Sequence, residues 1–237
     1  MEDYAVILDY LPLGYVDENT STFKKKPIAQ AIGTKNFTLL ELIPQNGVDL
    51  EIDDTVYIGK DKDKRDKISR VKGILDYENL TATSRAELDF VIKDIIEDNN
   101  DHFIKFFNES DAVSIRLHML ELLPGIGKKH MEAILKAREE KPFEDFEDLK
   151  NRVPLLNDPV GSIVKRVEIE IDTVSIKKGK NKYNIFTQIK KPRPQRDGRN
   201  SRNNRNSRDS KNSRGNSSRR NYSKGNSSRK RNYRPKD

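Results

Sequence analysis

Short apolar runs separated by turn residues occupy about the first 75 positions of the chain. Gly33-Thr34-Lys35-Asn36 and Asn46-Gly47 are turn signals between such runs. The predicted strands lie at 4–11, 28–33, 37–43, 55–58 and 71–75. Several short strands joined by turns predict a small β-barrel of the OB or S1-like kind.

The spacing of apolar residues changes to a helical period after Ser84. Ser84 and Glu87 form a capping-box pattern, and the apolar positions that follow predict a helix ending near Asn99-Asn100. The next segment, 103–107, is aromatic and predicted to be helical. We expect its phenylalanines to pack in the core; the alternative is that they stack on bases.

Proline, glycine and capping residues divide the following stretch into more helices. Four are predicted: 111–123, 128–139, one capped by Asp145, and one capped by Asp158 with Pro159 at its first position. A β-hairpin is predicted over 173–189. The fold class is α+β, and the predicted parts are a β-barrel-like domain (1–80), a helical connector (81–110), a helical module with a C-terminal helix and hairpin (111–189) and a basic tail (190–237).

Charge is distributed unevenly along the 237 residues, although the net charge is only +8. Residues 190–237 contain 18 Lys and Arg against 3 Asp and Glu, which leaves 28 basic and 35 acidic residues in 1–189. An acidic body therefore precedes a strongly basic arm. This asymmetry indicates a partner rich in phosphate or another anionic surface.

Composition also excludes several classes of protein. The chain contains no cysteine, which excludes a disulfide framework, a cysteine zinc site and a cysteine nucleophile. No apolar run approaches the roughly 20 residues that span a bilayer. The acidic start Met1-Glu2-Asp3-Tyr4 lacks the basic region of a signal peptide. We therefore expect a soluble, cytoplasmic protein without a membrane partner.

The tail has the composition of a disordered segment. Residues 190–237 contain 9 Ser and 9 Asn and lack Val, Ile, Leu and Phe, so they cannot offset their ordering entropy by burial. Basic residues recur every third position, and arginine with tyrosine suits single-stranded RNA. The alternative is repeat slippage that left a solubilising tail. The predicted contacts are Arg193, Arg196, Arg199, Arg202, Arg205, Arg208, Arg214, Arg219 and Arg220.

A glycine turn, Gly125-Ile126-Gly127, separates two of the predicted helices. Its amides lie at the N-terminus of the second helix, where unpaired N–H groups and the helix dipole favour an anion. Lys128 and Lys129 follow directly and are predicted to reach the same phosphate. Residues 111–156 contain 8 basic and 9 acidic residues, so a structural or protein-docking role for the turn stays open.

Two resemblances bear on this turn. Leu122-Leu123-Pro124-Gly125-Ile126-Gly127-Lys128 resembles the helix-hairpin-helix motif of nucleic-acid-binding proteins. The downstream residues Ala133-Ile134, Arg138, Pro142-Phe143 and Asp148-Leu149 resemble the form found in competence-type DNA receptors. That resemblance implies contact with the nucleic-acid backbone without sequence specificity. Four features lie within roughly residues 1–189: the β-rich start, the Leu-Pro-Gly-Ile-Gly turn, the helix at Asp158-Pro159 and the predicted strand at Lys182-Tyr183. Together they resemble an archaeal family of predicted RNA-binding proteins whose common domain has no assigned function. This second resemblance implies RNA as the ligand and a setting in translation or ribosome biogenesis.

Candidate chemistry elsewhere in the chain is sparse. His102, His118 and His130 show no metal-ligand spacing, and the acidic residues between 53 and 66 match no EF-hand loop. Phosphate-loop, nucleophile-elbow and dinucleotide fingerprints are absent from the sequence. Lys24-Lys25-Lys26 is a candidate RNA contact at the barrel edge, or simply a solvated loop. We expect no catalytic site, no metal and no cofactor.

The sequence therefore predicts a non-catalytic protein that binds nucleic acid, with RNA favoured over DNA. Two alternatives remain open. One is a DNA-binding or repair accessory protein, which the glycine turn alone would favour. The other is a protein-docking subunit of a ribosomal or other ribonucleoprotein complex, whose acidic body contacts a basic partner.

Overall fold

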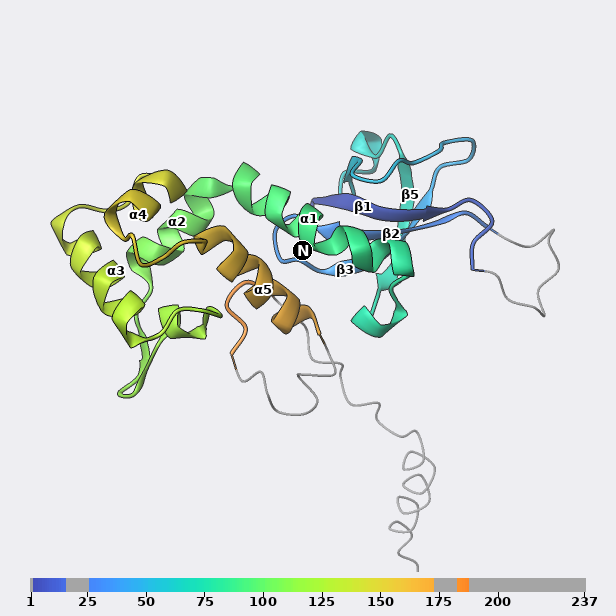
Figure 1. Cartoon of the computed structure of the whole chain (residues 1–237). Coiled ribbons are helices and arrows are strands. Elements are labelled where there is room, and N and C mark those ends of the chain that lie inside the picture. The colour runs from blue at the N-terminus through green and yellow to red at the C-terminus, as the bar shows by residue number, and fades with distance from the viewer. Residues whose placement is uncertain (1, 16–25, 173–182, 188–237) are drawn as a thin grey trace, which may run out of the picture. The chain divides into compact units, whose positions relative to one another are not determined.

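The N-terminal part of the protein is an antiparallel sheet that curls into a half-barrel (Figure 1). The computed structural model describes residues 2–15, 26–172 and 183–187. The strand order is β4-β1-β2-β3-β5. The strands are β1 (Tyr4–Leu11), β2 (Ile28–Gly33), β3 (Leu39–Pro44), β4 (Thr55–Tyr57) and β5 (Ile68–Ile74). All five predicted strands are present, and the α+β class is confirmed.

Both faces of the sheet are buried, which explains why its strands are so apolar. In β1, Ala5 and Ile7 face the interior of the half-barrel, whereas Val6 and Leu8 join the core shared with the helices. Side chains of adjacent strand residues point to opposite faces, so one strand contributes to two cores. The sheet and the helices are thus held together by a common apolar cluster.

The first helix, α1 (Ala82–Asp98), begins earlier than the predicted capping box. Thr81 is its N-cap: the Thr81 hydroxyl accepts the Ser84 N–H at 3.0 Å and donates to Asp9 at 2.7 Å. The Thr81 N–H in turn donates to the side chain of Gln30, which is fully buried in β2. The sheet therefore fixes the start of α1, and α1 lies along β1 (Figure 1).

The remaining helices are α2 (Asn100–Glu109), α3 (Lys128–Glu140), α4 (Phe146–Arg152) and α5 (Pro159–Ile171). Of these, α5 and α2 contact α1, and α4 contacts α5. Asp145 and Asp158 cap α4 and α5 as predicted, each accepting a backbone N–H through its carboxylate. Phe103 and Phe107 are buried in the helical core, so the prediction of core packing for this aromatic segment is confirmed.

The helix predicted over 111–123 is wrong. This segment forms two short paired strands, β6 (Ala112–Ser114) and β7 (Leu117–His118), followed by a 3₁₀ helix, Met119–Leu122. Leu120 and Leu123 are buried at a spacing of three residues, which suits the three-residue turn of a 3₁₀ helix.

Two other predicted features concern the C-terminal part. The hairpin predicted over 173–189 lies mostly outside the described residues, and 183–187, which are described, contain no strand. The tail, 190–237, lies outside the described residues as well. Within the part of the chain that the structure describes, no helix combines the length and apolarity needed to cross a membrane.

Candidate nucleic-acid interface

A tight turn joins the 3₁₀ helix Met119–Leu122 to α3. The Leu123 N–H donates to Leu120 O, and the Ile126 N–H donates to Leu123 O, each at 3.1 Å. Gly125 has φ +88°, in the left-handed region that residues with a side chain rarely adopt. The backbone at this position therefore requires glycine, independently of any ligand.

The two residues after Gly125 differ in exposure. Ile126 is only 4% exposed and belongs to the helical core. Gly127 is exposed, has φ −99°, and a Cβ built on it would meet no atom within 4 Å. Ile126 thus anchors the turn, and the backbone at Gly127 is open to close approach. The Ile126 amide, predicted as a phosphate donor, is already occupied by Leu123 O.

The free donors of this turn lie at the start of α3. Gly127 is the N-cap of this helix of 13 residues, and Lys128 and Lys129 are exposed in its first turn. The first amides of a helix have no partner inside it. The Gly127 N–H makes only a long contact, 3.4 Å, with Nδ1 of His130. Among the described residues, Lys128 and Lys129 form no salt bridge, so both ammonium groups are available to an anion.

His118 holds the chain in position just before the turn. Its Nδ1 accepts the Leu120 N–H at 3.1 Å, while Glu121 accepts the His118 N–H at 2.9 Å. Burial, with the nearby Arg138 guanidinium, lowers the pKa of His118. A neutral imidazole has a ring nitrogen that can accept, which this cap requires.

A buried ion pair joins the turn to the last described segment of the chain. Arg166 and Glu170, one helical turn apart on α5, form a salt bridge of 2.7 Å with side chains 7% and 0% exposed. The Arg166 guanidinium also donates to Leu122 O at 3.3 Å and to Tyr183 O. Arg166 therefore touches both the start of the glycine turn and the start of the segment 183–187.

Glu170 holds the segment 183–187 through its backbone. Its carboxylate accepts the N–H groups of Ile185 (2.8 Å), Phe186 (3.0 Å) and Thr187 (2.9 Å), as well as the Thr187 hydroxyl. Three successive amides converging on one carboxylate form an anion-binding nest. The chain is thus anchored at Thr187, three residues before Lys190, where the predicted tail begins. All nine arginines predicted to contact RNA in that tail lie outside the described residues.

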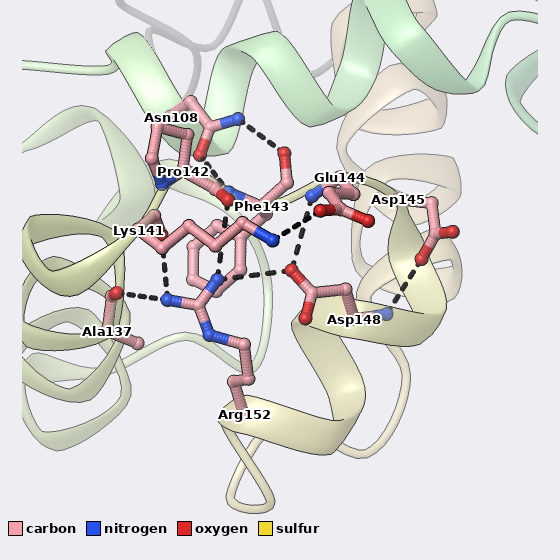
Figure 2. Close-up of polar contacts among 9 residues, drawn as sticks. All are labelled: Asn108, Ala137, Lys141, Pro142, Phe143, Glu144, Asp145, Asp148 and Arg152. Atoms are coloured by element: carbon pink, nitrogen blue, oxygen red, sulfur yellow. Dashed lines mark hydrogen bonds and ion pairs between the residues drawn. The ribbon is translucent and has the colours of Figure 1, made fainter.

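The other end of α3 is fixed by Arg152 of α4 (Figure 2). Its guanidinium donates to the carbonyls of Ala137 and Lys141, pairs with Asp148 at 3.1 Å and lies 4.7 Å from the centre of the Phe143 ring. Asn108 of α2 bonds both the N–H and the carbonyl of Phe143, at 2.8 and 2.9 Å. Phe143 and Asp148, which belong to the pattern resembling DNA receptors, therefore have structural partners here and help to position α3.

The structure does not bring the candidate metal ligands of the sequence together. In the described part of the chain, no group of three or more His, Asp or Glu side chains is placed to hold a metal ion. Among the acidic residues between 53 and 66, Asp54 pairs with Lys67 at 2.8 Å and Asp61 with Lys64 at 3.5 Å. Lys24 and Lys25 lie outside the described residues.

The fold and this interface define an α+β protein with a half-barrel sheet and a helical part that carries an exposed glycine turn. Residues 1–188 match the family model described as a protein of unknown function, DUF655. The chain belongs to this family.

Two archaeal relatives show the same relationship. The uncharacterized protein MJ0038 of Methanocaldococcus jannaschii is 43% identical over 190 residues, which cover 80% of this chain and 82% of that protein. The crystal structure of Af1531 from Archaeoglobus fulgidus, also a DUF655 protein, matches with a TM-score of 0.72 and 41% identity, over 79% of this chain and 100% of that one. The predicted resemblance to an archaeal family of unassigned function is confirmed at this level.

Proposed function

We propose that this protein binds nucleic acid, with RNA preferred over DNA, and that it catalyses no reaction. In this proposal, the turn at Gly125 and Gly127 positions one backbone phosphate, with Lys128 and Lys129 beside it. The basic tail supplies most of the affinity, since phosphate contacts dominate binding and carry little sequence information.

The observation that supports this most directly is the double contact of Arg166. One guanidinium binds Leu122 O, at the start of the turn, and Tyr183 O, in the segment that leads to the tail. Desolvating a buried ion pair costs free energy, so its charged groups need hydrogen-bond partners for their remaining donors and acceptors. Here it fixes the start of the glycine turn beside the segment 183–187, which precedes the predicted tail in the sequence.

We also propose finer descriptions of the two folded parts. The turn acts as a helix-hairpin-helix unit whose first arm is shortened to a 3₁₀ helix. The half-barrel is of the OB type, which the five antiparallel strands and the open sheet support. The setting in translation or ribosome biogenesis is part of the proposal and rests on the family resemblance alone.

The test compares three ligands for the full chain: single-stranded RNA, single-stranded DNA of the same sequence and duplex DNA, each of about 16 nucleotides or base pairs. Fluorescence anisotropy at about 150 mM salt measures each affinity. We expect the RNA to bind most tightly. Tighter binding of duplex DNA would favour the DNA-accessory alternative, and absence of binding to all three would refute the proposal.

A second experiment addresses the protein-docking alternative. The tagged full chain is purified from its host with and without nuclease treatment, and the bound components are identified by mass spectrometry. Loss of ribonucleoprotein components after nuclease treatment is expected if RNA carries the interaction. Components that survive the treatment would favour direct docking to a protein.

A further inference from the structure

We infer that a basic groove at one end of the half-barrel binds the phosphate backbone of a nucleic-acid strand. This sheet-end groove has a volume of about 600 Å³, and its charged lining consists of Lys26, Lys62, Arg65 and Arg70. The inference rests on the proposed function and deepens it, because it adds a contact surface on the folded body that is separate in sequence from both the glycine turn and the tail.

The groove is built where three strands end or begin at the same end of the sheet. Pro44, the last residue of β3, pairs with Ile68, the first residue of β5. Lys26 lies two residues before the start of β2, which pairs with β3. The Gln45 N–H donates to Lys67 O at 2.9 Å and extends the contact between β3 and β5 into the following loop. The position of the groove is thus set by strand pairing.

The lining of the groove is positively charged. Among the described residues, it contains four basic side chains and no Asp or Glu. Two neighbouring carboxylates are engaged elsewhere: Asp54 pairs with Lys67 and Asp61 pairs with Lys64, neither of which lines the groove. Asp63 and Asp66 flank Lys62 and Arg65 in the sequence, but they do not belong to the lining. Within the described ranges, Lys26, Lys62 and Arg70 take part in no salt bridge. Their charge is therefore available to an external anion.

Arg65 differs from the other three because its side chain is fixed by the backbone. Its Nε donates to Gly59 O at 2.9 Å, and its Nη2 donates to Ile58 O at 2.8 Å. These carbonyls follow β4, so Arg65 ties the end of that edge strand to the loop before β5. It places one half-buried, immobilised cation in a lining whose other cations are exposed.

An extended strand fits this arrangement better than a single phosphate group. The cations come from three separate segments, and the lining also includes the apolar residues Pro27, Ile43, Pro44 and Ile68. A positive groove that follows a backbone, with apolar surface for sugars and bases, is how proteins bind single strands without reading their sequence. Residues 1–189 carry more acidic than basic side chains, so a local surplus of positive charge is where a polyanion would approach the body most favourably.

The test uses the full chain with three groove cations neutralised: Lys26→Gln, Lys62→Gln and Arg70→Gln. The matched control removes the same charge from exposed helical lysines, as Lys93→Gln, Lys105→Gln and Lys150→Gln. Arg65 is left intact because it supports the fold. Binding of single-stranded RNA and of DNA with the same sequence is measured by anisotropy over a range of salt concentrations, and circular dichroism with thermal melting checks that both variants fold.

The groove variant is expected to lose about tenfold in affinity at moderate salt, and its salt slope should fall by about 2, since each lost phosphate contact on a single strand removes about 0.7. The control should keep the wild-type slope. If the groove variant loses affinity for both RNA and DNA, the contact is to phosphate. If it loses affinity for RNA alone, the contact includes the ribose 2′-hydroxyl. Equal slopes for the groove and control variants would overturn the groove while leaving the proposed function standing. Absence of binding by the wild-type chain would overturn both.

Discussion

Arg166 and Glu170 form the most deeply buried ion pair among the described residues, with 2.7 Å between Nε and Oε1. Both side chains also bind backbone groups that are distant in sequence: Arg166 binds Leu122 O, and Glu170 binds three amides of 185–187. The pair therefore acts as a junction between α5, the glycine turn and the final described segment.

Replacing Glu170 by Gln should destabilise the protein by about 3 kcal/mol, because removing one member of a buried pair leaves the other charge uncompensated. The amide side chain also has one acceptor oxygen where the carboxylate has two. Urea unfolding of the full chain measures the change. Glu97→Gln, at an exposed salt bridge on α1, is the matched control and should change stability by less than about 0.5 kcal/mol. Equal effects of the two substitutions would contradict a structural junction at Glu170.

The sequence predicted this helix but missed the junction. The apolar stripe of α5 was identified from its period, and its members are buried. Arg166 and Glu170 lie at helical spacing from Ile163 on that same inward face, and this charged pair within an apolar stripe was the available signal. Its partners at Leu122 and 183–187 could not be found, because the period of a helix carries no information about distant backbone groups.

Strand bounds were predicted well where both faces of the strand are buried. β1 and β2 match the predicted residues because continuous apolar runs end at turn residues. β3 begins at Leu39 instead of Phe37, since Phe37 has φ +51° and leaves the extended conformation. The position of the glycine turn was predicted correctly. That the Ile126 N–H is already bonded to Leu123 O could not be predicted, because residue spacing does not reveal a local hydrogen bond.

Glu168 should make stability depend on pH. Burial, with the neighbouring Asp89 carboxyl, raises the pKa of Glu168 to about 7. The folded state therefore binds a proton that the unfolded state releases near 4.5. Stability contributed by this proton is fully present below that value and is lost as pH rises through about 7. Because the side chain is half-exposed, we expect a loss of about 1 kcal/mol after allowance for solvent screening.

The variant Glu168→Gln tests this direction of the pH dependence, because without the titrating carboxyl it should unfold at nearly the same urea concentration at pH 5 and at pH 8. The control is Glu132→Gln, which replaces an exposed residue of α3. The wild-type chain and this control should both lose stability between pH 5 and pH 8. Parallel pH profiles for all three proteins would show that Glu168 titrates normally.

Arg152 should be irreplaceable by lysine. A lysine keeps the charge but cannot donate in parallel to the carbonyls of Ala137 and Lys141 while facing Phe143 (Figure 2). We expect Arg152→Lys to destabilise the protein by about 1–2 kcal/mol, measured by thermal unfolding. Lys150→Arg on the exposed side of α4 is the control and should be neutral. A neutral result for Arg152→Lys would mean that charge alone holds this junction.

The two glycines of the turn should respond differently to substitution. Gly125→Ala forces a side chain into φ +88° and should cost about 1 kcal/mol of stability. At Gly127 the φ is ordinary and a Cβ would meet no atom within 4 Å, so we expect Gly127→Leu to retain the fold while its side chain blocks approach to the α3 amides. Weaker RNA binding by Gly127→Leu, with unchanged melting, is the expected result. Unchanged binding would remove the turn from the interface.

Deletion of residues 190–237 should flatten the salt dependence of RNA binding. The segment carries a surplus of 15 positive charges, and on a single strand each phosphate contact contributes about 0.7 to the slope, so complete engagement would remove about 10. The comparison needs the full chain and the deletion variant on the same RNA across one salt series. A matched control keeps residues 190–237 but replaces the eight basic residues at every third position from 193 to 214 by Gln. If length alone mattered, this control would retain the wild-type slope; if the arginine series contacts phosphate, its slope should fall between those of the other two proteins.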